Sequence, residues 1–334
     1  MLKNKTIMIL VLIAMLIVFD YLVPSIDVSK RAIVVGIGLG EEKGRLLLSI
    51  QSLSRKKGET AEYQVNSVTC DELVDGIETL GLTLGGRLSL AHTLTIIVED
   101  NATALSALDY LAKNNLVSDR TYILATTISA KDILSAKATG NESTSAVLRE
   151  SQEIAKTRAG VPPCNVRKYL SDSAGVGRCV NLPAVTVKEG DFSITTCLSV
   201  KDGSPVFLMD EVGCLGVSLV EGRIFDAKTY VKDLDASVEL VSSKLSFSMS
   251  DGAVRLQLKL SAKAFNSQGL EKDEQLAVEQ HVVAAVTHAF NQGATHDCDV
   301  LHICQRVKAF YPEQWSTLPP QISLLPLQVE VRFV

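Results

Sequence analysis

Strict alternation of apolar and polar residues marks two segments in the last third of the chain. Every second residue from Val254 to Ala264 is apolar, and residues 327–333 repeat this pattern. A period of two places alternate side chains on opposite faces of a strand, so both segments are predicted to be strands with one buried face. The chain is therefore expected to end as a half-buried strand.

Two helices are predicted between these strands. The first covers residues 275–291 and is expected to end at Gly293, because glycine readily adopts the left-handed conformation of a helix C-cap. The second covers residues 297–311 and is expected to end at Pro312, because the residue before a proline avoids helical geometry. The residues expected to form the buried face of the first helix are Leu276, Val283, Val286 and Phe290.

Strands and helices also alternate upstream of this region. Strands are predicted over residues 33–38, 46–53, 94–98 and 122–125, the first two forming a hairpin. Thr69 and Glu72 predict a capping box for a helix that buries Leu73 and Leu80. Further helices are predicted around residues 105–111, from Ser129, over 144–157 and around 166–170. From residue 184 the pattern indicates short strands separated by turns at 188–191, 201–205 and 221–222.

These patterns predict an α+β fold with several domains. The sheets are expected to be mixed or antiparallel, with helices packed against them. The last domain is expected to combine antiparallel strands, the helix pair and the closing strand. The predicted segments are an N-terminal anchor (1–28), an α+β domain (29–185), a small β-rich domain (186–232) and a second α+β domain (233–334).

The N-terminus has the pattern of an export signal. Lys3 and Lys5 precede an almost purely apolar run that ends near Asp20. A basic lead followed by such a run predicts a single membrane span, with the rest of the chain on the extracytoplasmic side. No clean Ala-x-Ala cleavage site follows, which favours an uncleaved anchor. The predicted anchor residues include Ile7, Leu10, Ile13, Leu16 and Phe19.

Composition narrows the classes of function. The 334 residues carry a net charge of −5, and 46% of them are hydrophobic. This mild acidity, with no basic cluster along the sequence beyond the first residues, argues against a nucleic-acid-binding protein. Only 5% of the residues are aromatic, so platforms that stack on bases or sugars are not expected. The sequence also contains no pattern that calls for a cofactor.

Two clusters suggest ligand chemistry on a first inspection. His296, Cys298, His302 and Cys304 resemble a zinc site, but one helix would point Cys304 away from the others, so buried thiols and surface histidines are favoured. The glycines at 36, 38 and 40 lack the spacing of a phosphate-binding loop and precede a predicted hairpin. Close packing or a bulge is the favoured interpretation of these glycines.

Catalytic and disulfide chemistry are less clearly indicated. His92 and Ser89 lie near a predicted strand without the G-x-S-x-G elbow of a hydrolase, so His92 is interpreted as a histidine hydrogen-bonded at a strand edge. Seven cysteines in an exported chain permit disulfides and leave at least one thiol free. Two pairings would close modest loops, and the sequence does not choose between them or the fully reduced state: Cys164 with Cys179, and Cys197 with Cys214.

The order of several segments resembles that of one protein family. These segments are residues 31–38 (RAIVVGIG), His92 before a strand, residues 130–134 (AKDIL), and residues 310–315 (FYPEQW) after Asp299. In this order they resemble the Ger(x)C family, the C subunits of bacterial spore germinant receptors. Family members usually carry a lipid-modified cysteine before the first strand. This chain has no cysteine before Cys70, so the apolar N-terminal segment would have to hold it in the membrane.

The resemblance implies a non-catalytic subunit without a cofactor. It would lie on the outer face of the spore inner membrane and assemble with the membrane-spanning A and B subunits of a germinant receptor. The helix pair at 275–311, with Tyr311 and Trp315 at its end, is the candidate interaction surface. An alternative is a membrane-tethered extracytoplasmic module that binds a small ligand, which would need a concave pocket with converging polar groups.

Overall fold

The computed structural model describes most of the chain after the predicted anchor. The described residues are 15, 31–54, 62–136, 142–156, 160–175, 177, 179–188, 191–222, 225–250, 253–264, 270–316 and 325–333. No helix within these ranges combines the length and apolarity needed to cross a bilayer. The predicted anchor residues Ile7, Leu10, Ile13, Leu16 and Phe19 lie outside the described residues.

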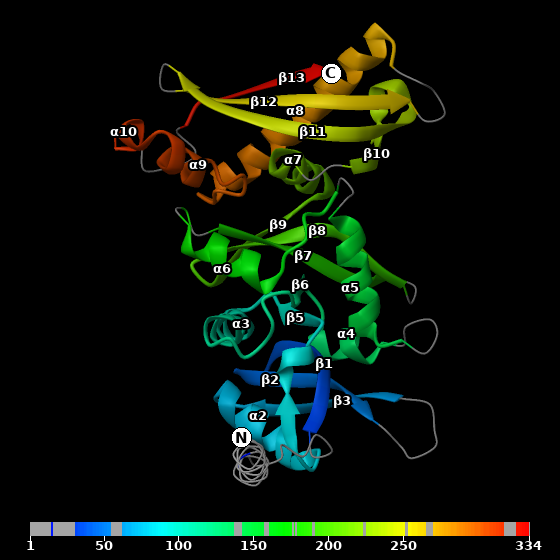
Figure 1. The fold of residues 1–334 in the computed structure, drawn as a ribbon, viewed down its shortest axis with the longest axis vertical. Helices are drawn as coiled ribbons and strands as arrows, with labels where there is room; N and C mark the ends of the chain where they lie inside the picture. The colour runs from blue at the N-terminus through cyan, green and yellow to red at the C-terminus, as the bar shows by residue number, and fades with distance from the viewer. Residues whose placement is uncertain are drawn as a thin grey trace, which may run out of the picture.

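A nine-stranded mixed sheet forms the first and larger part of the molecule (Figure 1). Its strands are β1 (Arg31–Glu42), β2 (Arg45–Ser54), β3 (Glu62–Cys70), β4 (Arg87–Ser89), β5 (Thr95–Glu99), β6 (Tyr122–Thr126), β7 (Cys179–Lys188), β8 (Asp191–Lys201) and β9 (Ser204–Met209). The main order is β3-β2-β1-β5-β6-β7-β8-β9, and β4 pairs with β1.

The centre of this sheet is parallel and its two ends are antiparallel. β1 pairs with β5, and β5 with β6, in parallel, whereas β1 to β3 and β7 to β9 form antiparallel meanders. All residues of β6 are buried, because parallel strands are covered by helices on both faces. This burial explains why β5 and β6 are continuous apolar runs without alternation.

Helices pack on both faces of the nine-stranded sheet (Figure 1). One core lies under α2 (Leu73–Thr83), α3 (Ala102–Lys113) and α6 (Val166–Ala174). A smaller core on the opposite face lies under α4 (Ala130–Ser135) and α5 (Thr144–Ala155). The short 3₁₀ turn η2 (Leu90–His92) leads into β5.

A four-stranded sheet forms the other end of the molecule (Figure 1). Its strands, in order, are β10 (Phe225–Val231), β11 (Ala236–Ser250), β12 (Ala253–Ala264) and β13 (Leu327–Phe333), with the 3₁₀ turn η3 (Lys232–Leu234) between the first two. The helices of this part are α7 (Glu211–Glu221), α8 (Lys272–Thr295), α9 (Ile303–Phe310) and α10 (Pro312–Trp315). A single core joins α7, α8 and the buried face of this sheet.

The predicted α+β fold is confirmed, and most of the predicted strands are in place. β12 and β13 match the two alternating segments, and β13 pairs parallel to β12. The helices between them return the chain to the end of the sheet where β12 began, which a parallel pairing requires. Ser129 caps α4 by accepting from the backbone N–H of Asp132, as the predicted helix start at Ser129 implies.

Several local predictions are wrong. The capping box fails because Thr69 lies in β3, where its hydroxyl donates to Glu42, and Glu72 makes no side-chain cap. Residues 211–221 form helix α7, where the sequence predicted only short strands and turns. α8 runs past Gly293 to Thr295, and Leu276 is 53% exposed although it was expected to be buried.

The division of the chain into domains at residues 28, 185 and 232 remains a prediction. Within 186–232, β8 and β9 extend the nine-stranded sheet and β10 belongs to the four-stranded sheet. The described strands of this stretch therefore form no sheet of their own. The two sheets meet where α7 follows β9, close to the segment that connects α8 with α9 (Figure 1).

Candidate functional site at the junction of the two sheets

Residues 296–302 form a junction segment that lies between α8 and α9 and contacts the nine-stranded sheet. The ring of His296 stacks on Phe207 of β9, with ring centroids 4.5 Å apart. Lys201 of β8 donates to the carboxylate of Asp297 at 2.8 Å. The junction segment thus rests on the antiparallel end of the nine-stranded sheet.

The middle of the junction segment is fixed by a covalent bond and a buried hydrogen bond. Cys298 forms a disulfide with Cys179 of β7, 119 residues away in the sequence. Asn181 of β7 donates its side-chain amide to the carbonyl oxygen of Val300 at 2.9 Å. Asn181 in turn accepts from the hydroxyl of Ser199 at 3.0 Å, so its amide is oriented by the sheet.

Local backbone geometry gives the junction segment its shape. Asp297 and His302 both adopt positive φ angles, near 50° and 53°, so the chain turns sharply at each end of the segment. A side chain at Gly293 would collide with the carbonyl of Cys298 and with Val300. Gly293 therefore serves close packing inside α8, which explains why it does not end the helix.

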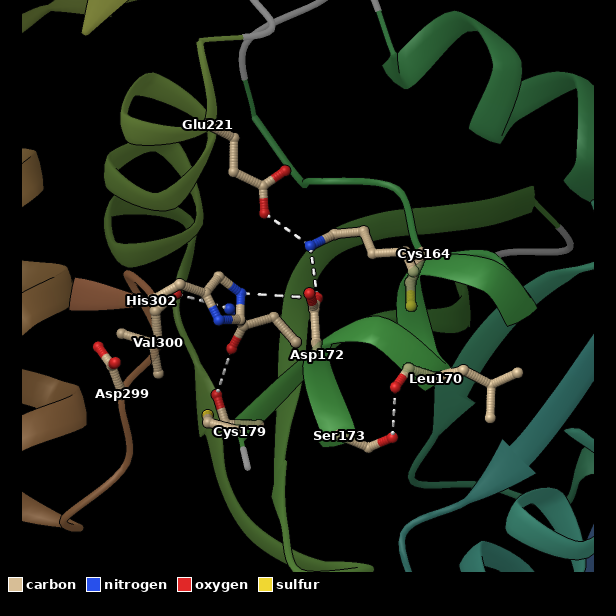
Figure 2. Close-up of polar contacts among 12 residues, drawn as sticks. Cys164, Leu170, Asp172, Ser173, Cys179, Glu221, Asp299, Val300 and His302 are labelled. Atoms are coloured by element: carbon tan, nitrogen blue, oxygen red, sulfur yellow. Dashed lines mark hydrogen bonds and ion pairs between the residues drawn. The ribbon is translucent and has the colours of Figure 1, made fainter. Parts of the chain in front are cut away.

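A cluster of buried charges lies beside the junction segment (Figure 2). The ammonium of Lys168 on α6 is 2.7 Å from Asp172 and 2.9 Å from Glu221, the last residue of α7. His302 Nε2 lies 3.5 Å from the same Asp172 oxygen. The side chains of all four residues are 10–14% exposed. Three elements, α6, α7 and the start of α9, therefore meet through paired charges.

Electrostatics keep the ion pairs of this cluster charged. Burial by itself would lower the pKa of Lys168, but the carboxylates of Glu221 and Asp172 raise it above the ordinary lysine value. The ammonium is therefore held in its charged form. Removing one partner from such a buried pair leaves the other charge uncompensated, which is costly.

Asp299 connects the junction segment to α9. Its two carboxylate oxygens accept from the backbone N–H groups of Ile303 and Cys304, each at 2.7 Å. These donors have no partner within the helix, so the carboxylate stabilises the start of α9. Burial raises the pKa of Asp299 above the ordinary value, although His302 and the two N–H groups act in the opposite direction. Burial and the neighbouring Asp299 also raise the pKa of the Cys304 thiol.

The predicted metal-like cluster is divided by these contacts. Cys298 is engaged in the disulfide, while His296 and His302 contact different partners. Among the described residues no group of three or more histidine, cysteine or acidic side chains is arranged to hold a metal ion. The arrangement can instead join the two parts of the molecule in one defined geometry, sensitive to reduction and to the loss of a charge.

The disulfide differs from both pairings considered from the sequence. Cys179 pairs with Cys298, so it is not available to Cys164. Cys70, Cys164, Cys197 and Cys214 are buried cysteines that form no disulfide, and Cys304 is partly buried. The sequence gave no signal for the pairing of Cys179 with Cys298, because the two residues are far apart in the chain and belong to different elements of the fold.

Tyr311 and Trp315, the predicted interaction residues, lie at the C-terminal side of α9. Both are partly buried and pack on the core that joins α8 to the four-stranded sheet. The ring of Tyr311 contacts Phe247 of β11, with centroids 5.9 Å apart. The neighbouring Phe310 is 69% exposed, a feature that periodicity did not reveal. A role of this rim in binding remains a prediction.

The glycines and His92 also have defined places. A side chain at Gly36 would overlap the hydroxyl of Ser145, and one at Gly40 would overlap Glu99, which confirms the close-packing interpretation. The pairing of β1 with β2 also shifts register just before Gly36, as a bulge would. His92 is exposed in η2 and, among the described residues, has no hydrogen-bond partner, contrary to expectation.

The comparisons with known proteins agree with this architecture. Residues 24–187 match a family described as the spore germination protein N-terminal domain. The chain belongs to the Ger(x)C family. A solved structure described as the crystal structure of the GerBC protein is similar to this Ger(x)C chain, with 13% identity and a TM-score of 0.56. The likeness covers 89% of this chain and 96% of that one and shows a shared fold. No curated protein matches the chain.

Proposed function

We propose that this Ger(x)C chain is the non-catalytic C subunit of a spore germinant receptor. The match of residues 24–187 to the spore germination domain carries the proposal, and a fold shared with GerBC along most of the chain supports it. In this role the chain is held at the spore inner membrane by its N-terminal segment, with the remainder on the outer side. There it assembles with the A and B membrane subunits.

The junction between the two sheets fits a subunit that couples partners through its surfaces. Lys168 is paired with both Asp172 and Glu221, so these charges serve cohesion between α6 and α7. The disulfide and the contacts of residues 296–302 add a second set of links between the two parts. A displacement imposed on one sheet by a partner would therefore reach the other sheet without a catalytic step.

Purification from sporulating cells tests this proposal. A tagged full chain, extracted from membranes with mild detergent, is expected to retain its unprocessed mass and to co-purify with two other membrane proteins. Leu10→Arg with Ile13→Arg places two charges in the predicted span, each costing about 2.5–3.5 kcal/mol at a helix centre, and should release the chain from the membrane fraction. The matched variant Leu10→Ile with Ile13→Leu should remain there. A processed, soluble wild-type chain without membrane partners would overturn the proposal.

One cavity favours the alternative of a ligand-binding module. It is open to solvent and has a volume of about 710 Å³ between α5, α7 and the first strand of the four-stranded sheet. Phe192 and Val212 contribute apolar walls, and His281 and Gln152 contribute polar groups. The side-chain oxygen of Gln152 is buried and has no hydrogen-bond partner among the described residues. The cavity therefore combines apolar walls with a few polar groups, as small-molecule sites do.

Thermal shifts distinguish this second function. The full chain would be melted with separate panels of free amino acids, nucleosides and sugars, since a ligand that binds only the folded state raises the melting temperature with its concentration. A saturable rise that is lost in Gln152→Leu would favour the ligand-binding module. A flat response to all three panels would leave the subunit role as the supported one.

A further inference from the structure

The face of the four-stranded sheet that points away from α8 is strongly basic. α8 and α7 pack on the opposite face, where the alternate residues of β12 are buried (Figure 1). Positive side chains on the open face are contributed by all four strands: Lys228, Lys244, Arg255, Lys259, Lys263 and Arg332. We call these six residues the basic face. On the described strands of this surface only Glu239 and Glu330 carry negative charge, and Asp235, which accepts from the hydroxyl of Tyr230, adds a third carboxylate at its β10 edge. This excess contrasts with the net charge of −5 of the whole chain.

Three cations of the basic face lie directly opposite one another. Lys244 of β11 is paired in register with Lys259 of β12, and Lys259 is paired with Arg332 of β13. Adjacent strands are about 4.8 Å apart, so the side chains form a row across the sheet. Like charges directly opposite on neighbouring strands are destabilising. The isolated chain therefore carries an electrostatic cost at this row.

Carboxylates of the described chain pair with only one of the three cations of this row, Arg332. Lys244 and Lys259 make no ion pair within 4.0 Å among the described residues, and both are exposed. Arg332 lies 3.7 Å from Glu330 of its own strand, and both side chains are more than half exposed. Glu239 is engaged with Lys263 at 3.3 Å, farther along the sheet. An anionic partner would remove the repulsion that the chain itself leaves in place.

The surroundings of the row also suit carboxylates. Hydroxyl and amide groups fill the remaining outward positions of β11, β12 and β13, including Ser242, Ser246, Ser248, Gln257, Ser261 and Gln328. Such groups donate hydrogen bonds to carboxylate oxygens while the cations supply the charge. β11 has 15 residues and so extends over roughly 50 Å, which gives a long and open surface.

We propose that the basic face binds an acidic surface of a partner protein, in which aspartate and glutamate side chains lie against the row of Lys244, Lys259 and Arg332. The four-stranded sheet lies at the opposite end of the molecule from β1, the strand that follows the predicted anchor (Figure 1). An anchored chain would hold this face away from lipid headgroups, so the choice of a protein over a membrane rests on the proposed anchor. The charge excess of the basic face does not depend on the proposed anchor, and the partner need not be a receptor subunit.

Peptide binding tests the basic face. The full chain in detergent is titrated into a fluorescent poly-L-glutamate peptide, and anisotropy is read at about 0.05 M and about 0.3 M salt, where the screening length differs more than twofold. Lys244→Gln with Lys259→Gln should weaken binding about tenfold at low salt, since each exposed charge pair contributes up to about 1 kcal/mol. Lys131→Gln with Lys308→Gln removes the same charge from exposed positions on α4 and α9 and should change it less than about twofold.

The binding losses of the two double variants distinguish a role of the basic face from a general effect of net charge. Equal losses in the two double variants would overturn the proposal, because binding would then follow net charge alone. Binding to phosphatidylglycerol vesicles that depends on Lys244 and Lys259, without binding to the peptide, would overturn it in favour of a lipid surface. Arg332→Gln alone should give a partial loss and guards against a folding defect in the double variant. Membrane co-purification of the chain is read separately, so failure here leaves the proposed receptor role intact.

Discussion

Replacing Lys168 with methionine tests whether the charge cluster holds the junction together. Methionine keeps most of the length of the side chain but removes the ammonium that lies 2.7 Å from Asp172 and 2.9 Å from Glu221. Asp172 and Glu221, each on a side chain that is 10% exposed, would then lose the ammonium that joins them, while Arg306 still interacts with Glu221 and His302 lies 3.5 Å from Asp172. Breaking a buried ion pair by removing one partner costs about 3–5 kcal/mol. Because some solvent reaches these groups, we expect a loss of about 3 kcal/mol at neutral pH.

The effect should depend on pH in a defined direction. Without Lys168 the folded-state pKa of the two carboxyl groups rises above the unfolded values, which are near 4. At a pH between the unfolded-state and folded-state pKa values, the folded variant binds more protons than the unfolded chain, so the stability of the variant increases as the pH falls. The difference between Lys168→Met and wild type should therefore shrink from pH 7 towards pH 5.

Urea unfolding followed by circular dichroism measures both quantities. Lys113→Met is the matched control, because Lys113 forms an exposed i,i+4 pair with Asp109 at 2.7 Å. That pair should contribute no more than about 0.5 kcal/mol. If Lys168→Met costs no more than the control, or if its cost does not change with pH, the cluster does not hold α6 to α7 as inferred. Adding Glu221→Gln to Lys168→Met should recover part of the loss.

Three further predictions follow from single contacts. Gly216→Ala should destabilise the chain by about 1–3 kcal/mol despite the better helix propensity of alanine, because its Cβ would collide with the carbonyl of Ala285 on α8; an unchanged melting temperature would contradict this packing. Cys298→Ser should lower the free energy of unfolding by about 2–4 kcal/mol and make it insensitive to dithiothreitol, so continued sensitivity would argue against the Cys179 pairing. Burial lowers the pKa of His281, so the unfolded state takes up its proton first and stability should fall as the pH drops below about 6.5. His281→Gln should flatten that decline in urea titrations, and an equally steep decline would assign it to other groups.

Local sequence patterns were sufficient to predict an element where one of its faces is buried and the other is exposed to solvent. β12 and β13 show this case, since their alternation predicts both the strands and the buried residues. The start of α4 at Ser129 was equally predictable, because a serine cap accepts hydrogen bonds from backbone N–H groups within its own turn. In each case the interactions that decide the structure lie within a few residues of sequence.

The same rules fail for α7. Residues 213–220 of this helix are all buried, so the segment has no polar face and no helical period to detect. Gly213 and Gly216 lower its helix propensity further. Helix formation there depends on burial between α8 and the two sheets, which is a property of the assembled core. Gly293 is a similar case, because its packing against Cys298 overrides its preference for a helix end.

Local patterns in the sequence are enough to predict the fold class, the family resemblance, an N-terminal span and most strands, because periodicity, turn residues and motif order are local properties. The junction depends on long-range contacts, since Lys168, Glu221 and His302 meet there from three elements and Cys179 meets Cys298. The basic face depends on such contacts too, and a chain of net charge −5 does not suggest it. Strand register places cations that are far apart in sequence in one row, and no local pattern encodes that register.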